Sequence, residues 1–232
     1  GVSCRGILEL NFGTCVEGTG GRGFDSFFPT SSCPALKIQI DDPVVFSTPL
    51  PSISSICAGE SLQIPFSSFI QNISNCNLGT ASSSSRAVQL RVRFLEGRIP
   101  PHNILLSNSE DFSQAFSLSK EGFFQVDFPF LPAKIAASTS LPSLWIRLID
   151  TVPYIESFIE VELVIQSLKN PHEWRSIIRQ KMLLRSTLRY KKSPNSNFLL
   201  VVNLENTFEE IQAWIDVTSR LGCIADIWDL NQ

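Results

Sequence analysis

Three groups of residues in this sequence have types and spacings that could carry chemistry, and the first is a glycine-rich loop. Residues 18–23 read Gly-Thr-Gly-Gly-Arg-Gly, which matches the G-x-G-x-x-G pattern of dinucleotide-binding loops. Such a loop holds a pyrophosphate only where it joins a strand to a helix, because the helix N-terminus supplies amide donors. Residues 24–29 begin no helix, so we interpret the loop as a glycine turn and expect no nucleotide cofactor.

The second group is the two histidines, one of which any serine or cysteine nucleophile would need as its base. His102 follows two prolines in an apparent loop, and His172 lies in a basic segment, so both fit surface positions. The G-x-S-x-G sequence of α/β-hydrolases is absent from the chain. We assign no catalytic residue, although a triad assembled from distant residues stays open.

The third group is the cysteines and acidic residues that could hold a metal ion. The six cysteines include no C-x-x-C pair, so a structural zinc site is not expected. Asp25, Asp41 and Asp42 lie at apparent strand ends, where acidic loops can bind calcium, but such residues more often form turns. We assign no metal ligand and no cofactor.

The cysteines also bear on the cellular compartment. We favour reduced thiols in a cytoplasmic protein, because an odd number of the cysteines, five, precede residue 77 and disulfides among these would leave one unpaired. The alternative is a secreted sandwich with one or two disulfides, and residues 72–74, Asn-Ile-Ser, fit a glycosylation acceptor. No apolar run approaches the roughly 20 residues of a membrane-spanning helix.

The elements that must position these residues are mostly β-strands. Hydrophobic residues make up 43% and charged residues 18% of the 232-residue chain, which excludes a disordered chain. Apolar and polar residues alternate, as in strands with one buried face, over residues 7–12, 36–40, 62–66, 88–94, 124–130, 144–149 and 159–165. About seven short strands separated by turn formers predict a mainly β fold, an immunoglobulin-like antiparallel β-sandwich, for residues 1–169. The Cys-Trp-Cys arrangement of true immunoglobulin domains is absent.

Residues 170–196 are interpreted as a basic connector of a short helix followed by a strand. Asn170 and Pro171 are typical of a helix start, and Trp174, Ile177, Ile178 and Met182 fall on one helical face. Residues 169–192 contain eight basic residues and one acidic residue, a local charge of +7. The remaining residues carry −10, and the two parts give the net charge of −3.

Six side chains of this connector form a possible basic contact surface. They are Arg175, Arg179, Arg185, Arg189, Lys191 and Lys192. Such a cluster suits nucleic acid, an anionic surface or an acidic protein surface. We favour contacts with the acidic remainder of the same molecule, because only Trp174 and Tyr190 could stack on bases.

Residues 197–232 contain the clearest local unit of the chain. Residues 198–202 are an apolar run typical of a buried parallel strand, Thr207 and Glu210 match a capping box, and Gly222 suits a helix end. The predicted buried stripe of the helix contains Phe208, Ile211, Trp214, Ile215 and Leu221. With a second strand at residues 224–230, the pattern predicts a parallel β-α-β unit. We expect an α/β domain that is incomplete within this chain, because a doubly wound layer needs more strands.

The end of this unit resembles a known type of segment. Leu221-Gly222, Asp226 and Trp228-Asp229-Leu230 are similar to a segment of large, uncharacterised eukaryotic multidomain proteins, in which sandwich-like regions precede α/β regions. The resemblance covers about the last 35 residues. It implies an arrangement of domains and no activity.

These observations predict a non-enzymatic structural or protein-interaction segment of a larger protein, whose partner is another protein or another domain of the same chain. The rival hypothesis is part of a nucleotide-binding or hydrolytic enzyme. Ligands of α/β layers lie beyond the carboxyl ends of parallel strands, where this chain has Asn203, Glu205 and Asp229. A third hypothesis is a nucleic-acid binder that uses the basic contact surface.

Overall fold

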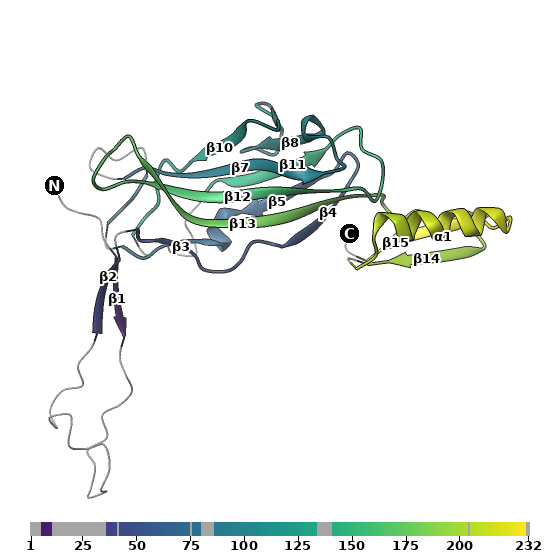
Figure 1. Ribbon diagram of the computed structural model, residues 1–232, viewed down its shortest axis with the longest axis horizontal. Coiled ribbons are helices and arrows are strands. Elements are labelled where there is room, and N and C mark those ends of the chain that lie inside the picture. The colour runs from purple at the N-terminus through teal and green to yellow at the C-terminus, as the bar shows by residue number, and fades with distance from the viewer. Residues whose placement is uncertain are drawn as a thin grey trace, which may run out of the picture.

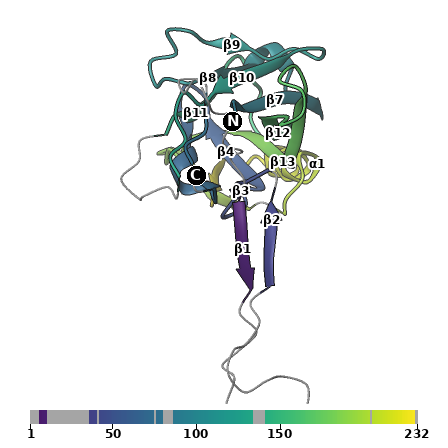
Figure 2. The ribbon, with the colours of Figure 1, turned by 90° about the vertical axis from the view of Figure 1, so that its left-hand side faces the viewer.

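Two β-sheets packed face to face form most of the molecule (Figures 1 and 2). The computed structural model describes residues 6–10, 36–40, 42–74, 76–79, 86–133, 141–203 and 205–230. A small unit of two strands and one helix lies at one end of the sandwich, and a ribbon of two strands lies at the other (Figure 1). The predicted mainly β, sandwich-type fold is confirmed.

The larger sheet has five strands. In spatial order they are β10 (Phe123–Asp127), β7 (Val88–Gly97), β12 (Glu156–Gln166), β13 (Trp174–Thr187) and β4 (Ile53–Cys57). All neighbours pair antiparallel except β13 and β4, which pair in parallel. The two longest strands, β12 and β13, run along the whole sandwich (Figure 1). β12 begins and β13 ends beside the small C-terminal unit.

The smaller sheet has four antiparallel strands. They are β5 (Ser61–Pro65), β11 (Ser143–Leu148), β8 (Ile104–Ser107) and β9 (Phe116–Ser117). Two further antiparallel pairs are β1 (Gly6–Leu10) with β2 (Leu36–Ile40), and β3 (Val44–Phe46) with β6 (Ile70–Asn72). Short 3-10 turns occupy Phe66–Ser68 and Pro101–Asn103.

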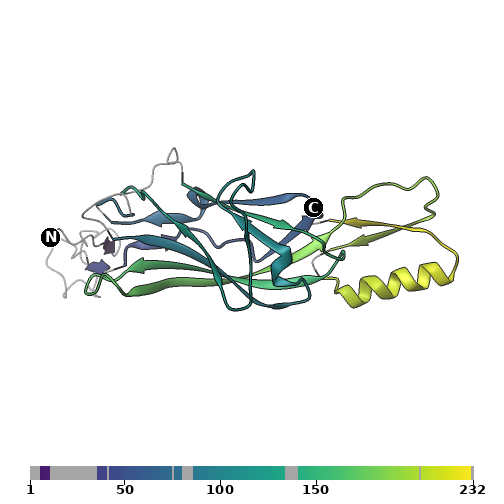
Figure 3. The same ribbon diagram turned by 90° about the horizontal axis from the view of Figure 1, so that it is seen from above.

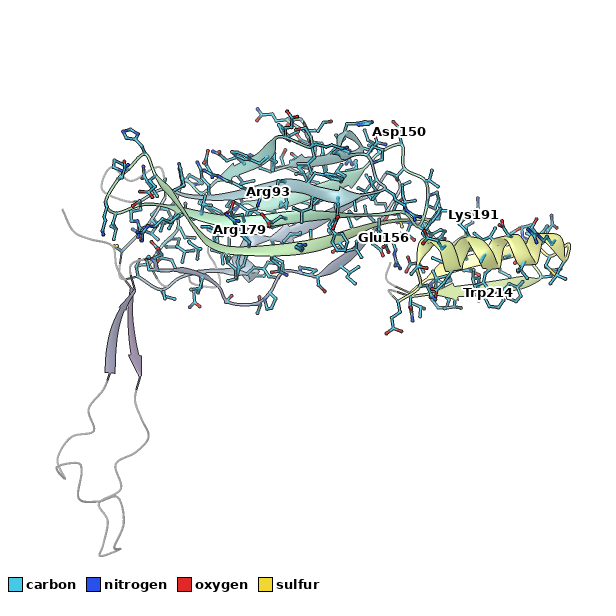
Figure 4. The ribbon with its side chains drawn as sticks, in the orientation of Figure 1. Arg93, Asp150, Glu156, Arg179, Lys191 and Trp214 are labelled. Carbon is cyan, nitrogen blue, oxygen red and sulfur yellow. The ribbon has the colours of Figure 1, made fainter. Side chains whose placement is uncertain are left out.

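Side-chain alternation sends one set of residues from each central strand into the core. In β7 and β12, Val88, Leu90, Val92, Ile159, Val161 and Leu163 are fully buried. The opposite set carries charge on the outer face of the sheet, where Glu160 pairs with Arg93 and Glu162 with Arg179. Figure 4 labels the two arginines. This is the pattern of an antiparallel sheet with one face on the core and one face in water.

Ion pairs on this outer face perturb one carboxylate. Burial alone would raise the pKa of Glu162, but hydrogen bonds from Ser176 and Arg179 outweigh it, and the pKa is lowered. Arg179 Nε lies 2.7 Å from Glu162 Oε1. Nearby, the Arg91 guanidinium lies 5.1 Å from the centre of the Phe123 ring and 5.2 Å from that of Trp174.

The helix predicted in the basic connector of residues 170–196 is wrong. Residues 174–187 form β13, the continuation of the main sheet, so the sheet extends well beyond the boundary expected at residue 169. Leu163 pairs with Ile178, but Val164 pairs with Ser176, so the register shifts by one residue at Ile177. Because of this bulge, Trp174 pairs with Gln166 and lies on the opposite face of the sheet from Ile178 and Met182, so these residues do not share a face as the predicted helix required.

Two polar expectations from the sequence change with the structure. Cys57 and Cys223 are free thiols, but Cys76 is disulfide-bonded, so the reduced-thiol interpretation fails for Cys76. Asn72, the residue of the glycosylation motif, is fully buried. Its Nδ2 donates to the carbonyl oxygens of Cys76 at 3.0 Å and Leu131 at 3.1 Å, so it is no acceptor in the folded chain. Residues 18–23, Asp25 and Asp41 lie outside the described residues.

The C-terminal unit consists of β14 (Phe198–Val202), α1 (Phe208–Arg220) and β15 (Ala225–Asp229). The strands pair in parallel, with α1 on one side of them (Figure 3). The capping box of Thr207 and Glu210 is present, and Gly222 has a φ of +69° after the helix end, where a side chain would be strained.

Replacement of Gln180 by Leu tests the contact between the β13 side chain of Gln180 and the backbone of Leu50. Gln180 Oε1 accepts from the Leu50 amide at 2.9 Å, and its Nε2 donates to the Leu50 carbonyl. Gln180→Leu should lower the free energy of unfolding by about 2 kcal/mol, since a buried backbone amide and carbonyl lose their partner. Urea denaturation measures this. The exposed Gln125→Leu is the control, and an equal loss in both variants would contradict the assignment.

Candidate functional site

A buried arginine joins the sandwich to the C-terminal unit. Arg185, near the end of β13, is only 2% exposed. Its Nε donates to Glu156 Oε1 of β12 at 2.6 Å, while Nη1 and Nη2 donate to the carbonyl oxygens of Asn203 and Asn206, each at 2.8 Å. Because its acceptors come from both parts, Arg185 clamps the loop that follows β14 onto the sandwich.

A second buried polar contact lies beside this clamp. Thr187 Oγ1 donates to Asp229 Oδ2 at 3.0 Å, and the Asp229 side chain is fully buried at the end of β15. Both parallel strands therefore end against the last residues of β13.

Tyr154 of the sandwich inserts into the core of the C-terminal unit. It packs with Val202 and Ile211, and its amide donates to the Ser186 carbonyl at 2.7 Å. Its backbone has a φ of +65°, a conformation that costs free energy in a non-glycine residue. Its hydroxyl is buried and has no hydrogen-bond partner among the described residues, and burial raises the pKa of Tyr154 to about 12. The ring therefore contributes packing, and the hydroxyl contributes nothing that stabilises.

Two adjoining cavities lie on the sandwich near this junction, and the smaller is also lined by Phe208 and Glu209 of α1. The larger has a volume of 820 Å³ and the smaller 340 Å³, and both are lined by Glu96, Gly97 and Arg98. Arg98 pairs with Glu209 of α1, and its guanidinium lies 5.0 Å from the centre of the Phe208 ring. His102 and Lys120 line the larger cavity, and the backbone carbonyl of His102 accepts from Ser117 Oγ at 3.3 Å.

The six residues of the predicted basic contact surface do not form one surface. Arg175 pairs with Asp42 at 3.6 Å, Arg179 with Glu162, and Arg189 with Glu60. Arg185 is buried at the junction, and Lys191 and Lys192 are exposed just after β13 (Figure 4). Because β13 is a strand, it distributes these side chains along its length, and the four arginines contact acidic groups of the same molecule.

The three residues expected at the edge of an α/β layer are brought together, but not around an open crevice. The Asn203 carbonyl accepts from Arg185, and Asn203 Oδ1 accepts from the Glu205 amide at 2.9 Å. Asp229 is buried against Thr187. The carboxyl ends of β14 and β15, where an α/β enzyme would hold its ligand, are thus occupied by the sandwich.

The sequence-based analysis missed an apolar surface on the C-terminal unit. Two members of the predicted buried stripe of α1 are instead exposed, Trp214 at 54% and Leu221 at 73%. Nine of the seventeen exposed large hydrophobic residues of the described chain come from residues 198–230: Phe198, Leu199, Val201, Trp214, Val217, Leu221, Ile224, Trp228 and Leu230. The signal for it is the run of five apolar residues in β14, which two strands and one helix cannot cover on both faces.

Metal and membrane features are absent from the described part of the chain. Within it, no three His, Cys, Asp or Glu side chains gather in a way that could hold a metal ion. Among the same residues, no helix has the length and apolar character required to cross a membrane.

Replacement of Arg185 tests the clamp. Arg185→Met should cost about 3–5 kcal/mol, because it leaves Glu156 and two loop carbonyls without their cation. Hydrogen exchange should accelerate in β14 and β15 more than in β7 and β12. Arg179→Met, which removes an exposed ion pair, is the matched control and should cost under about 1 kcal/mol. Equal losses in the two variants would refute the clamp.

Replacement of Tyr154 by Phe separates its ring from its hydroxyl. Stability at neutral pH should stay equal or rise by about 1 kcal/mol, since an unpaired buried hydroxyl is removed. In the native chain the folded pKa lies above the unfolded value, so the folded state holds this proton more tightly. Stability should therefore fall as the pH rises from about 10 towards 12. Phenolate absorbance should lose its step near pH 12 in Tyr154→Phe. A destabilised variant would show that the hydroxyl has a partner.

Comparisons with known proteins identify no family for this chain. No protein-family model matches the chain, and no curated protein matches it. Among solved structures, the chain is similar to AggA, the major subunit of aggregative adherence fimbriae type I from Escherichia coli. The two share 11% sequence identity over 63% of this chain and 95% of that chain, with a TM-score of 0.23. A TM-score this low transfers neither topology nor function.

Proposed function

We propose that this protein is a non-enzymatic interaction protein, in which the β-sandwich is a scaffold and the apolar surface of the C-terminal unit binds a protein partner. The observation that carries the proposal is the gathering of exposed large hydrophobic residues on residues 198–230. Contiguous apolar patches of more than a few hundred Å² are rare on monomeric proteins and mark interaction sites.

The composition of the surface supports a protein partner. Trp214 and Trp228 are 54% and 44% exposed, and tryptophan is enriched among the residues that dominate binding energy at protein interfaces. The clamp of Arg185 holds this surface in one orientation relative to the sandwich, so less conformational freedom is lost when a partner binds.

Catalysis and nucleic-acid binding have less support from the same contacts. The strand ends where an α/β enzyme holds its ligand are occupied by Arg185 and Thr187. The arginines of the basic contact surface contact Asp42, Glu60, Glu156 and Glu162, so binding to phosphates would have to break these ion pairs.

Charge introduction on α1 tests the proposed interaction. Proteins that co-purify with the chain are identified, purified and titrated against it by calorimetry. Trp214→Glu should weaken direct binding at least tenfold, because a central aromatic contributes about 2 kcal/mol or more. Phe130→Glu changes an aromatic residue of similar exposure, 47%, on the sandwich and should leave the affinity unchanged. Binding that resists Trp214→Glu, or that Phe130→Glu weakens equally, would place the partner elsewhere.

A further inference from the structure

The two strands of the C-terminal unit differ in polarity. β14 is apolar at all five positions, Phe-Leu-Leu-Val-Val, as the central strand of a parallel sheet is when both of its faces are covered. β15 reads Ala-Asp-Ile-Trp-Asp, in which Asp229 is buried against Thr187 and Asp226 is a half-buried charged residue. Charged residues are typical of edge strands, where they discourage further pairing. By composition β14 is a central strand and β15 an edge strand.

The structure leaves β14 with a free edge. Among the described residues, the sheet of this unit contains β14 and β15 alone, and residues 198–202 make one further backbone hydrogen bond, from the Leu230 amide to the Val202 carbonyl at 3.0 Å. A strand paired on one side points alternate amides and carbonyls away from its neighbour. β14 therefore has the sequence of a strand with two neighbours and the pairing of a strand with one.

The rear face of β14 is also uncovered. Leu200 and Val202 pack towards α1, whereas Leu199 and Val201 point to the opposite face and are 46% and 45% exposed. Parallel sheets are found almost only with both faces covered, because their strands are apolar on both sides.

The two flanks of α1 also differ in polarity, as the two strands do. One flank of the helix is an exposed apolar stripe of Trp214, Val217 and Leu221, which lies about 100° around the helix axis from the residues buried against the strands. The opposite flank is polar and contains Gln212, Asp216 and Ser219. Consider the unit from the side of α1, with β14 and β15 both running upwards. In this view α1 runs downwards, and a right-handed crossover places β15 to the right of β14. In that frame the apolar stripe lies on the left, above the free edge of β14, and the polar flank lies towards β15.

We propose that the free edge of β14 is the docking site of a β-α segment that is not among these 232 residues. Its apolar strand pairs in parallel with β14, and its helix packs against Trp214, Val217 and Leu221. The inference rests on the proposed function and specifies the partner. A second copy of the chain fits less well, because a two-fold axis would pair the two β14 edges antiparallel, whereas the all-apolar sequence of β14 is typical of a strand in a parallel sheet.

The test uses a displayed library of segments, each a five-residue apolar strand, a turn and an amphipathic helix, selected on the immobilised 232-residue chain. Selected segments should lose more than tenfold in affinity on Val217→Glu or Leu221→Glu. Gln212→Glu and Ser219→Glu, on the opposite flank of the same helix, are the matched controls and should leave the affinity unchanged. Hydrogen exchange should slow in β14 and stay unchanged at the outer edge of β15.

Each contrary result overturns the inference in a recognisable way. Segments that respond to Ser219→Glu instead would place the added strand beside β15. Dimerisation of the chain alone that Val217→Glu abolishes would assign the surface to a second copy. If no segment is enriched over selection on an unrelated β-sandwich, while a co-purified protein still loses binding on Trp214→Glu, this inference fails and the proposed function stands. If Trp214→Glu and Val217→Glu affect no binding at all, both fail.

Discussion

Arg185 carries a guanidinium group, a cation with five donors in a fixed plane. Once buried, such a group must be surrounded by acceptors, because an unpaired buried charge costs several kcal/mol. The acceptors here are Glu156 of the sandwich and the carbonyls of Asn203 and Asn206. The need to satisfy one side chain therefore determines where the C-terminal unit sits.

The sandwich makes this clamp rigid. Glu156 begins β12 and Arg185 lies near the end of β13, and these two long strands pair side by side through the middle of the larger sheet. Glu156 and Arg185 are directly opposite each other in that register. The interaction at the junction is thus a cross-strand ion pair of the main sheet, held by the same core that holds Leu163 and Met182. A partner bound to the C-terminal unit would therefore contact a surface that is held in a fixed position relative to the whole sandwich.

The same arrangement separates two uses of an α/β unit. The carboxyl ends of parallel strands are where such units hold ligands, because helix N-termini and loop amides converge there. In this protein Arg185, Thr187 and Tyr154 occupy that end. The side of the unit left open is apolar, and apolar surface is suited to packing against protein rather than to chemistry.

The sequence by itself determined the sandwich, because alternation in segments such as residues 88–94 and 159–165 reports locally which side chains face a core. It also indicated the capped helix α1, since the capping box of Thr207 and Glu210 lies within one helical turn. Only the tertiary structure decided that residues 174–187 are a strand, because their pairing with β12 joins residues that local spacing does not relate. It alone decided which arginine is a clamp and which are surface pairs, since Arg175, Arg179 and Arg185 differ only in what lies opposite them. Partners distant in the chain are invisible to local patterns, and the site of this protein is built from such partners.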